Sequence, residues 1–430
     1  MKVLIVSHHP ISTTSNIGKT MSSLFKSFRK QELAQLYCYP SFTDVDKCNS
    51  FFKITDIDVL KSILPPFKLS SCEVKTDDIV SSVKSISVGK YTTVYRAKEE
   101  YKRLLREVIW KLARWYDIKL TEWLKREKPD YIFAAVGNAC FLYDMVLKIS
   151  KNNNIPIVAY ICDDYYFIKD KENFFGKLRY YFVKKKIEQL MKAVQKVVFI
   201  SEELKNIYTH SFGINGEVIM TGAETKEANS KNTKSETLTY MGNIRCNRYL
   251  SLFEIGKTID KINIQNGTDY QLHIYSPEKD EDILNTLKQA KSIQFKGFVS
   301  GEEFKKVFRE SEILLHTEAF DEESRDMVKH SVSTKIADSL ASGIPLIAYG
   351  PEEISSMQHL IRNDCAYIAT SPEQLEMMLL KAFNGEDTKR IVANAVKTAK
   401  EYHDSEKNSK KLREIFENLD KTSVNEEAYT

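Results

Sequence analysis

The chain has no long hydrophobic run, no metal-binding signature and no large excess of charge. Its apolar stretches fall well short of the roughly 18–20 residues that a membrane-spanning helix needs. The seven cysteines form no C-x-x-C pair, and the eight histidines form no H-E-x-x-H motif. These absences predict reduced thiols, as in a cytosolic protein, and no metal site. A formal net charge of +4 over 430 residues also argues against a dedicated nucleic-acid binder.

The beginning of the chain lacks the features of a secretory signal. Met1 leads directly into the short apolar run KVLIV, which SHHP follows. This run is too brief for the hydrophobic part of a signal peptide, and no small-residue cleavage site comes after it. We therefore predict a first strand at Val3–Val6 and a cytoplasmic location.

Two common nucleotide-binding motifs are missing as well. No G-x-G-x-x-G follows the first predicted strand of either half, which disfavours a nicotinamide dehydrogenase. The string NIGKT is similar to the end of a phosphate-binding P-loop. That motif needs a glycine five residues before Gly18, where this chain has Thr13. The P-loop interpretation is therefore rejected.

What the chain does have is a regular alternation of strand-like apolar runs and helical patterns, typical of α/β proteins with parallel sheets. Its length fits two domains of about 200 residues each. The polar stretch 222–236 is the best linker. We predict two doubly wound Rossmann-like domains, 1–221 and 237–395, facing across a cleft. The helical pattern and polar tail at 396–430 are expected to cross back to the first domain.

The most informative stretch runs from Ser292 to Pro351. It alternates strand and helix, and it places Ser333, Thr334 and Lys335 at the start of a short helix with Asp338 one turn later. A helix start offers unsatisfied N–H groups and a partial positive charge, and the lysine adds a cation, so a diphosphate suits this position. The carboxylate could hold ribose hydroxyls. An ordinary helix cap with a surface lysine is the alternative.

The second half resembles the nucleotide-sugar domain of the family 4 glycosyltransferases, which have the two-domain GT-B fold. The similar segments lie within 238–385 and read LTYMGNIRCNRYLSL, LHIYS, IQFKGFVSGEEF, ILLHTEAFD and SVSTKIADSLASGIPLIAYGP. In the first half the similarity is looser and covers the opening strand, the loop with Gly18 and AYICDDYY. The branch it looks most like assembles bacterial capsules and surface polysaccharides.

The resemblance implies an activity. Such enzymes move a sugar from a nucleotide diphosphate donor, most often UDP-linked, to a hydroxyl of a saccharide or a lipid-linked saccharide. It implies retention of the anomeric configuration and no required cofactor or metal ion. Two alternatives stay open: a nucleotide-sugar 2-epimerase on the same fold, and a non-catalytic subunit that binds a partner transferase.

The resemblance also implies roles for single residues. Asp338 falls where similar enzymes carry the second glutamate of a paired-glutamate motif, which holds the donor ribose. The position of the first glutamate, eight residues earlier, is His330 in this chain. No carboxylate role is carried over to it. His330 either contacts the donor or is structural, and its presence keeps the non-catalytic alternative open.

Further donor-site candidates follow other predicted strands of the second half. Gly242 would let the backbone approach the phosphates, and Arg245 or Arg248 would offset charge on the leaving diphosphate. We favour Arg248, and two solvated arginines are the alternative. Similar proteins receive the base in the turn that corresponds to GFVS. The remaining candidates are Tyr275, Ser276, Gly297, Phe298, Val299 and Glu318.

In the first half, Gly18 lies in a loop after the first strand, where backbone amides could meet phosphate or acceptor. Asp163 and Asp164 follow the predicted strand IPIVAYIC. A carboxylate there could orient or deprotonate the acceptor hydroxyl. A structural helix cap at Asp164 is the alternative.

The segment 174–192 carries lysines and an arginine among aromatic residues. Such a segment could lie on an anionic membrane surface, at its inner face, near a lipid-linked acceptor. The alternative is a solvated helix whose aromatic side chains pack inward.

Overall fold

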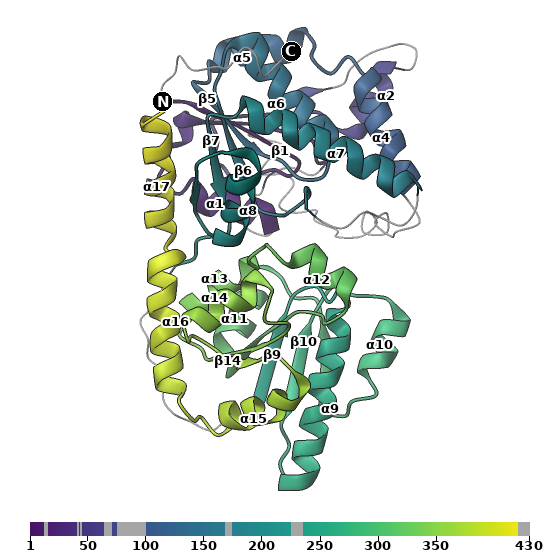
Figure 1. Cartoon of the computed structure of the whole chain (residues 1–430), viewed down its shortest axis with the longest axis vertical. Helices are drawn as coiled ribbons and strands as arrows, with labels where there is room; N and C mark the ends of the chain where they lie inside the picture. Colours follow the sequence, from purple (N-terminus) through teal and green to yellow (C-terminus); the bar gives the residue numbers. More distant parts are fainter. Residues whose placement is uncertain are drawn as a thin grey trace. The chain divides into compact units, whose positions relative to one another are not determined.

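The chain forms two compact units in a computed structural model, which describes residues 1–12, 16–40, 43, 45–63, 71–74, 100–167, 174–224 and 235–419 (Figure 1). The first unit comprises Met1–Ile219 together with Glu406–Thr430, and the second comprises Met220–Ser405. Each is described below by itself.

The first unit is built on an eight-stranded sheet with the order β4-β3-β2-β1-β5-β6-β7-β8. All neighbouring strands are parallel except β3 and β4. The order reverses at β1, so a crevice for ligands is expected beyond the carboxyl ends of β1 and β5. The strands are β1 Val3–Ser7, β2 Leu33–Tyr37, β3 Ser50–Lys53, β4 Cys72–Val74, β5 Tyr131–Ala135, β6 Ile157–Ile161, β7 Lys196–Phe199 and β8 Gly216–Val218.

Helices cover this sheet and bury its aliphatic strands. Every residue of β1 is buried, as expected for a central strand covered on both faces. Ser201, which follows β7, is the residue type expected at a helix start, and it caps α8 by accepting a hydrogen bond from the Leu204 amide at 3.1 Å. The helices are α1 Asn16–Leu24, α2 Asp56–Ile63, α4 Glu100–Leu112, α5 Ile118–Glu127, α6 Cys140–Asn153, α7 Phe174–Ala193, α8 Glu202–Phe212 and α17 Ser405–Glu417.

The C-terminal helix α17 packs into the first unit. Phe416 is fully buried, and its ring lies 5.4 Å from that of Tyr131 and 6.4 Å from that of Phe133. Arg413 donates two hydrogen bonds to Glu32, at 3.1 and 2.8 Å. These bonds hold the pKa of the Glu32 carboxyl down at about 2. The chain therefore passes between the two units twice, near residues 220 and 405.

The second unit has a six-stranded, all-parallel sheet with the order β11-β10-β9-β12-β13-β14. Here the order reverses at β9. Its strands are β9 Thr237–Met241, β10 Gln271–Tyr275, β11 Ile293–Gly297, β12 Ile313–Thr317, β13 Leu346–Tyr349 and β14 Tyr367–Ala369. Its helices are α9 Arg248–Asn266, α10 Glu281–Leu287, α11 Gly301–Glu310, α12 Glu322–Val328, α13 Thr334–Ala341, α14 Ser355–Arg362, α15 Pro372–Phe383 and α16 Thr388–Tyr402.

Two doubly wound, Rossmann-like sheets confirm the predicted fold class. The spacings of Ser300 with Glu303 and of Ser371 with Gln374 predict capping boxes at two helix starts. These two predictions are wrong, because neither serine makes a side-chain cap bond. The Gln374 side chain instead accepts a hydrogen bond from the Thr370 amide at 2.9 Å. None of the helices in the described ranges is long and apolar enough to cross a membrane.

Candidate functional site

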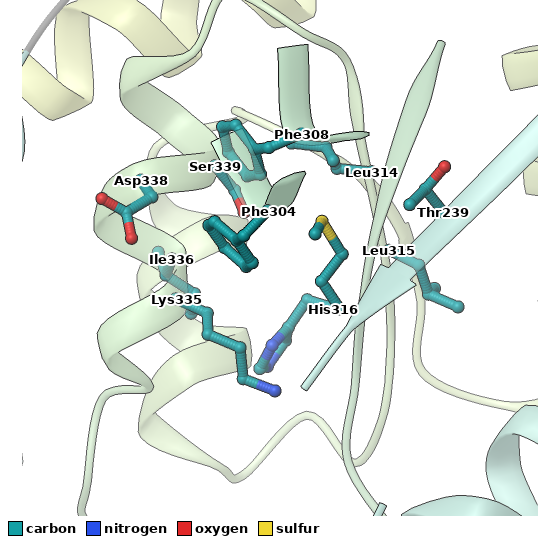
Figure 2. Close-up of a pocket in the computed structure, with 11 residues that line it drawn as sticks. Thr239, Phe304, Phe308, Leu314, Leu315, His316, Lys335, Ile336, Asp338 and Ser339 are labelled. Atoms are coloured by element: carbon teal, nitrogen blue, oxygen red, sulfur yellow. The ribbon is translucent and has the colours of Figure 1, made fainter. Parts of the chain in front are cut away.

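The predicted phosphate-binding residues gather where the strand order of the second unit reverses. Figure 2 shows Lys335 reaching from α13 toward His316 at the end of β12. These two residues line a cavity of about 40 Å³, which has room for a few water molecules but not for a nucleotide. Its lining residues are Thr239, Met241, Phe304, Phe308, Leu314, Leu315, His316, Lys335, Ile336, Asp338 and Ser339.

The Lys335 ammonium group lies against β9 and the turn that follows it. Its Nζ is 3.3 Å from the Tyr240 hydroxyl oxygen and 4.8 Å from the centre of the Tyr240 ring. A Cβ at Gly242 would come within 2.2 Å of Nζ, and Gly242 has a φ of 149°. Glycine is needed at this position because a side chain would displace the ammonium group. In the described part of the chain Lys335 makes no ion pair, so its charge is available to an anion.

The start of α13 is arranged as an anion site would require. Ser333 is the N-cap residue in an extended conformation, yet its side chain makes no cap bond. Its own amide donates to the Ser356 hydroxyl at 2.9 Å. Thr334 and Lys335 occupy the first turn, where backbone N–H groups have no partner within the helix. A phosphate group would satisfy these donors and the lysine together.

Arg248 begins α9 and is held by Glu318, which follows β12. Its Nε and Nη2 lie 2.7 and 2.6 Å from the same Glu318 oxygen, Oε2. Glu318 is only 2% exposed. Burial raises the pKa of the Glu318 carboxyl, and the positive charge of Arg248 partly opposes this rise. Arg245 is exposed, so the structure separates the two arginines that spacing could not: one is anchored and the other is solvated.

His316 is a site residue that the sequence analysis missed. It is 6% exposed, and its Nε2 has no hydrogen-bond partner in the described part of the chain. That atom lies 3.5 Å from Glu318 Oε1. Burial, assisted by the charges of Lys335 and Arg248, lowers the pKa of His316 to about 3, so the ring is neutral at physiological pH. The sequence could have indicated this residue, because a histidine follows three aliphatic residues near the end of the strand ILLHT.

Asp338 and His330 lie on either side of the start of α13. Asp338 is on the helix and lines the cavity, and Figure 2 shows its carboxylate directed away from the centre of the group. His330 is half-buried in the turn between α12 and α13 and is not among the cavity residues. The ribose role of Asp338 and the role of His330 stay predictions.

The predicted base-binding residues occupy the neighbouring strand ends. The Gly242 amide donates to the Tyr275 carbonyl, and the Ser276 amide donates to the Gly297 carbonyl, both at 2.9 Å. These bonds align the ends of β9, β10 and β11. Gly297 has a φ of 77°, which favours glycine, and the next side chain, Phe298, is exposed. Ser276 is buried, while Val299 is partly exposed.

The candidate residues of the first unit are Asp163, Asp164 and Gly18, and they differ in their hydrogen bonds and their positions. Asp164 accepts hydrogen bonds from the Tyr166 and Phe167 amides, both at 2.9 Å, so it stabilises a turn. Asp163 Oδ2 lies 3.3 Å from the Tyr165 hydroxyl. Gly18 is buried inside the first turn of α1, which begins at Asn16, and is not in a loop as predicted. Its amide still lies near a helix start.

Among the described residues, no three His, Cys, Asp or Glu side chains are placed to hold a metal ion. Metal independence stays a prediction.

No family model and no curated protein matches this chain. Solved structures do. HepE of Anabaena in complex with UDP has a TM-score of 0.61 at 12% identity, with 97% of this chain and all of that chain covered. TarM has 0.61 at 10% identity, covering 96% and 98%. A UDP-forming α,α-trehalose-phosphate synthase from Burkholderia vietnamiensis has 0.59 at 10% identity, covering 97% and 98%.

These likenesses extend over nearly the whole chain, so the two units together have the GT-B fold. At such low identity they show the fold alone. HepE has also been solved with UDP-glucose.

Proposed function

We propose that the chain is a glycosyltransferase that moves a sugar from a nucleotide diphosphate donor, UDP-linked, to a hydroxyl of a saccharide or lipid-linked saccharide. The observation that carries this is Lys335, which has no ion-pair partner in the described ranges and lies at a helix start against Gly242. The fold shared with proteins solved with UDP and UDP-glucose supports it. We propose retention of configuration, family 4 membership and a role in surface-polysaccharide assembly.

The proposed chemistry is charge stabilisation. The diphosphate would accept hydrogen bonds from the first amides of α13, from the Ser333 and Thr334 hydroxyls and from Lys335. Arg248 would face the same group through Nη1, because its Nε and Nη2 are taken by Glu318 while Nη1 makes only long contacts, 3.4 Å to Asn243 Oδ1 and 3.5 Å to the Arg245 carbonyl. As the sugar–phosphate bond breaks, these fixed cations and dipoles stabilise the negative charge on the leaving nucleotide. No metal ion or other cofactor enters this proposal.

The remaining roles follow from position. Asp338 would bind the ribose, and the strand ends at Tyr275 and Gly297 would receive the base. For the acceptor we favour Asp163 over Asp164, because Asp164 accepts two backbone amides of a turn, whereas Asp163 contacts the side chains of Cys162 and Tyr165. We place the protein in the cytoplasm, with a peripheral contact between 174–192 and the inner face of an anionic membrane.

Calorimetry with UDP tests the donor site. We expect Lys335→Ala to weaken UDP binding at least tenfold, because it removes a charge-assisted contact. The matched control is Lys288→Ala, an exposed lysine at the end of α10. Gly242→Ala should also weaken binding, because its methyl group would displace the ammonium group and because its φ of 149° disfavours any side chain. Wild-type protein that binds no UDP, or equal binding by both lysine variants, would refute the site.

Nuclear magnetic resonance of a donor-only reaction separates the transferase from a 2-epimerase. A transferase without acceptor leaves the donor sugar's configuration unchanged, whereas an epimerase converts it. A subunit without catalytic activity would bind UDP at most and consume no UDP-sugar with any acceptor.

A further inference from the structure

Helix α4 has its apolar side facing outward. Tyr101, Leu105, Val108 and Leu112 recur every three or four residues and so share one side of the helix. Between 50% and 67% of each side chain is exposed. Trp110, on the opposite side, is 1% exposed. The same periodicity would ordinarily mark a side that packs onto a core.

Specific bonds on the inner side fix this orientation. Arg106 donates from Nε to Asp56 at 2.8 Å and from Nη2 to His8 at 2.9 Å. The Glu107 carboxylate accepts the Cys140 and Phe141 amides, both at 3.0 Å, and so caps α6. Rotating α4 to bury its apolar side would break all four bonds and expose Trp110. The exposed stripe is therefore a built feature of the fold.

Helix α7 continues the same surface. Phe174, Phe175, Tyr181 and Phe182 are exposed, and they lie in two pairs separated by seven residues, which is two helical turns. The Tyr101 and Phe175 ring centres are 6.4 Å apart, so the two helices are joined at this point (Figure 1). We call the eight residues the α4–α7 face: Tyr101, Leu105, Val108, Leu112, Phe174, Phe175, Tyr181 and Phe182.

The charges around this face are mostly positive. Both acids of α4 are engaged on its inner side, Glu107 with α6 and Glu100 with Arg103 and Arg179. The single acid of α7, Glu188, pairs with Lys185 at 2.9 Å. Four basic residues are engaged with acids as well: Arg103 and Arg179 with Glu100, Arg106 with Asp56, and Lys186 with Asp144. The other basic residues of the two helices are Lys102, Lys111, Lys177, Lys184, Lys185 and Lys192.

We propose that the α4–α7 face binds the surface of an anionic lipid membrane. Aliphatic and aromatic side chains would enter the boundary between headgroups and acyl chains, and the lysines would contact lipid phosphates. This deepens the membrane part of the proposed function, because it makes α4 the main apolar anchor and a lipid-linked saccharide the fitting acceptor. Lipid binding needs no sugar donor, so its failure would leave the donor site untouched.

The test is flotation of the full chain with vesicles of phosphatidylcholine alone or mixed with about one third phosphatidylglycerol. We expect binding to the anionic vesicles only, weakened by salt. Leu105→Glu/Val108→Glu should reduce bound protein at least tenfold while UDP binding stays unchanged. Phe174→Ser/Tyr181→Ser is a second variant, on the other helix. Ile264→Glu, at a side chain 85% exposed on α9, is the control that should bind like wild type.

Three outcomes would overturn the proposal. One is wild-type protein that does not float with anionic vesicles. Another is equal flotation of the wild type and of both folded double variants. The third is a wild-type dimer in sedimentation velocity that Leu105→Glu/Val108→Glu converts to a monomer, because a second copy of the chain would then cover the face.

Discussion

At the scale of single residues, the candidate donor site contains a buried ion pair that no sequence motif describes. Glu318 and Arg248 are 70 positions apart and meet because β12 ends where α9 begins, at the same edge of the sheet. Their positions after predicted strands identified both residues as donor-site candidates. They did not predict that the Glu318 carboxylate pairs with Arg248, as the structure shows. Motifs locate strand ends well, but which side chains pair there is decided by packing between elements.

Replacing the two arginines separates their roles. Arg248→Ala leaves the Glu318 carboxylate buried without its partner, which typically costs about 3–5 kcal/mol. We expect a clear fall in the unfolding temperature and weaker UDP binding. Arg245→Ala removes an exposed side chain of the same turn and should change stability by less than about 0.5 kcal/mol. Thermal unfolding and calorimetry of both variants measure this, and equal stability of the two would contradict the buried pair.

At the scale of elements, the sequence predicted most strands and the short helix at 334 closely. The periodic apolar residues between about 94 and 128 predict one long helical stretch, but its described part forms two helices, α4 and α5. The orientation of α4 also escaped prediction. Periodicity shows that Leu105 and Leu112 share a side, but it does not show whether that side packs inward. Hydrogen bonds from Arg106 and Glu107 to other elements determine which side of α4 packs inward.

A pair of buried histidines connects α14 with the end of α16. His359 Nε2 and His403 Nε2 are 3.0 Å apart, and His403 Nδ1 lies 2.9 Å from the Thr221 carbonyl. If Nδ1 donates to that carbonyl, Nε2 must accept from His359, so both rings are neutral. Burial lowers the pKa of His359 to about 3 and that of His403 to about 4, the latter against the opposing charge of Asp338.

This pair makes stability depend on pH in a defined direction. A histidine with a depressed folded-state pKa binds more protons when unfolded, so its contribution is complete above about pH 6.5 and is lost as the pH falls toward 4. For His403 alone the loss at pH 5 is on the order of 2 kcal/mol. We expect the unfolding temperature to fall between pH 7 and 5, and to fall less steeply in His403→Gln. An identical slope in that variant would contradict this account.

At the scale of the whole molecule, the chain crosses between its units twice, and α17 completes the core of the first unit. Phe416 is fully buried against Phe28, Tyr131 and Phe133, so Phe416→Ala should destabilise the protein by about 3–5 kcal/mol. Lys410→Ala, on the exposed side of the same helix, is the matched control.

The location of that loss is as informative as its size. Because the proposed UDP-binding residues around α13 and α9 lie in the second unit, Phe416→Ala should leave the UDP dissociation constant of the folded protein unchanged. Hydrogen exchange followed by mass spectrometry should show faster exchange in β1 and β5, while β9 to β14 keep their protection. Faster exchange confined to the second unit would mean that α17 stabilises the donor-binding sheet instead, against its observed contacts with Glu32 and Tyr131.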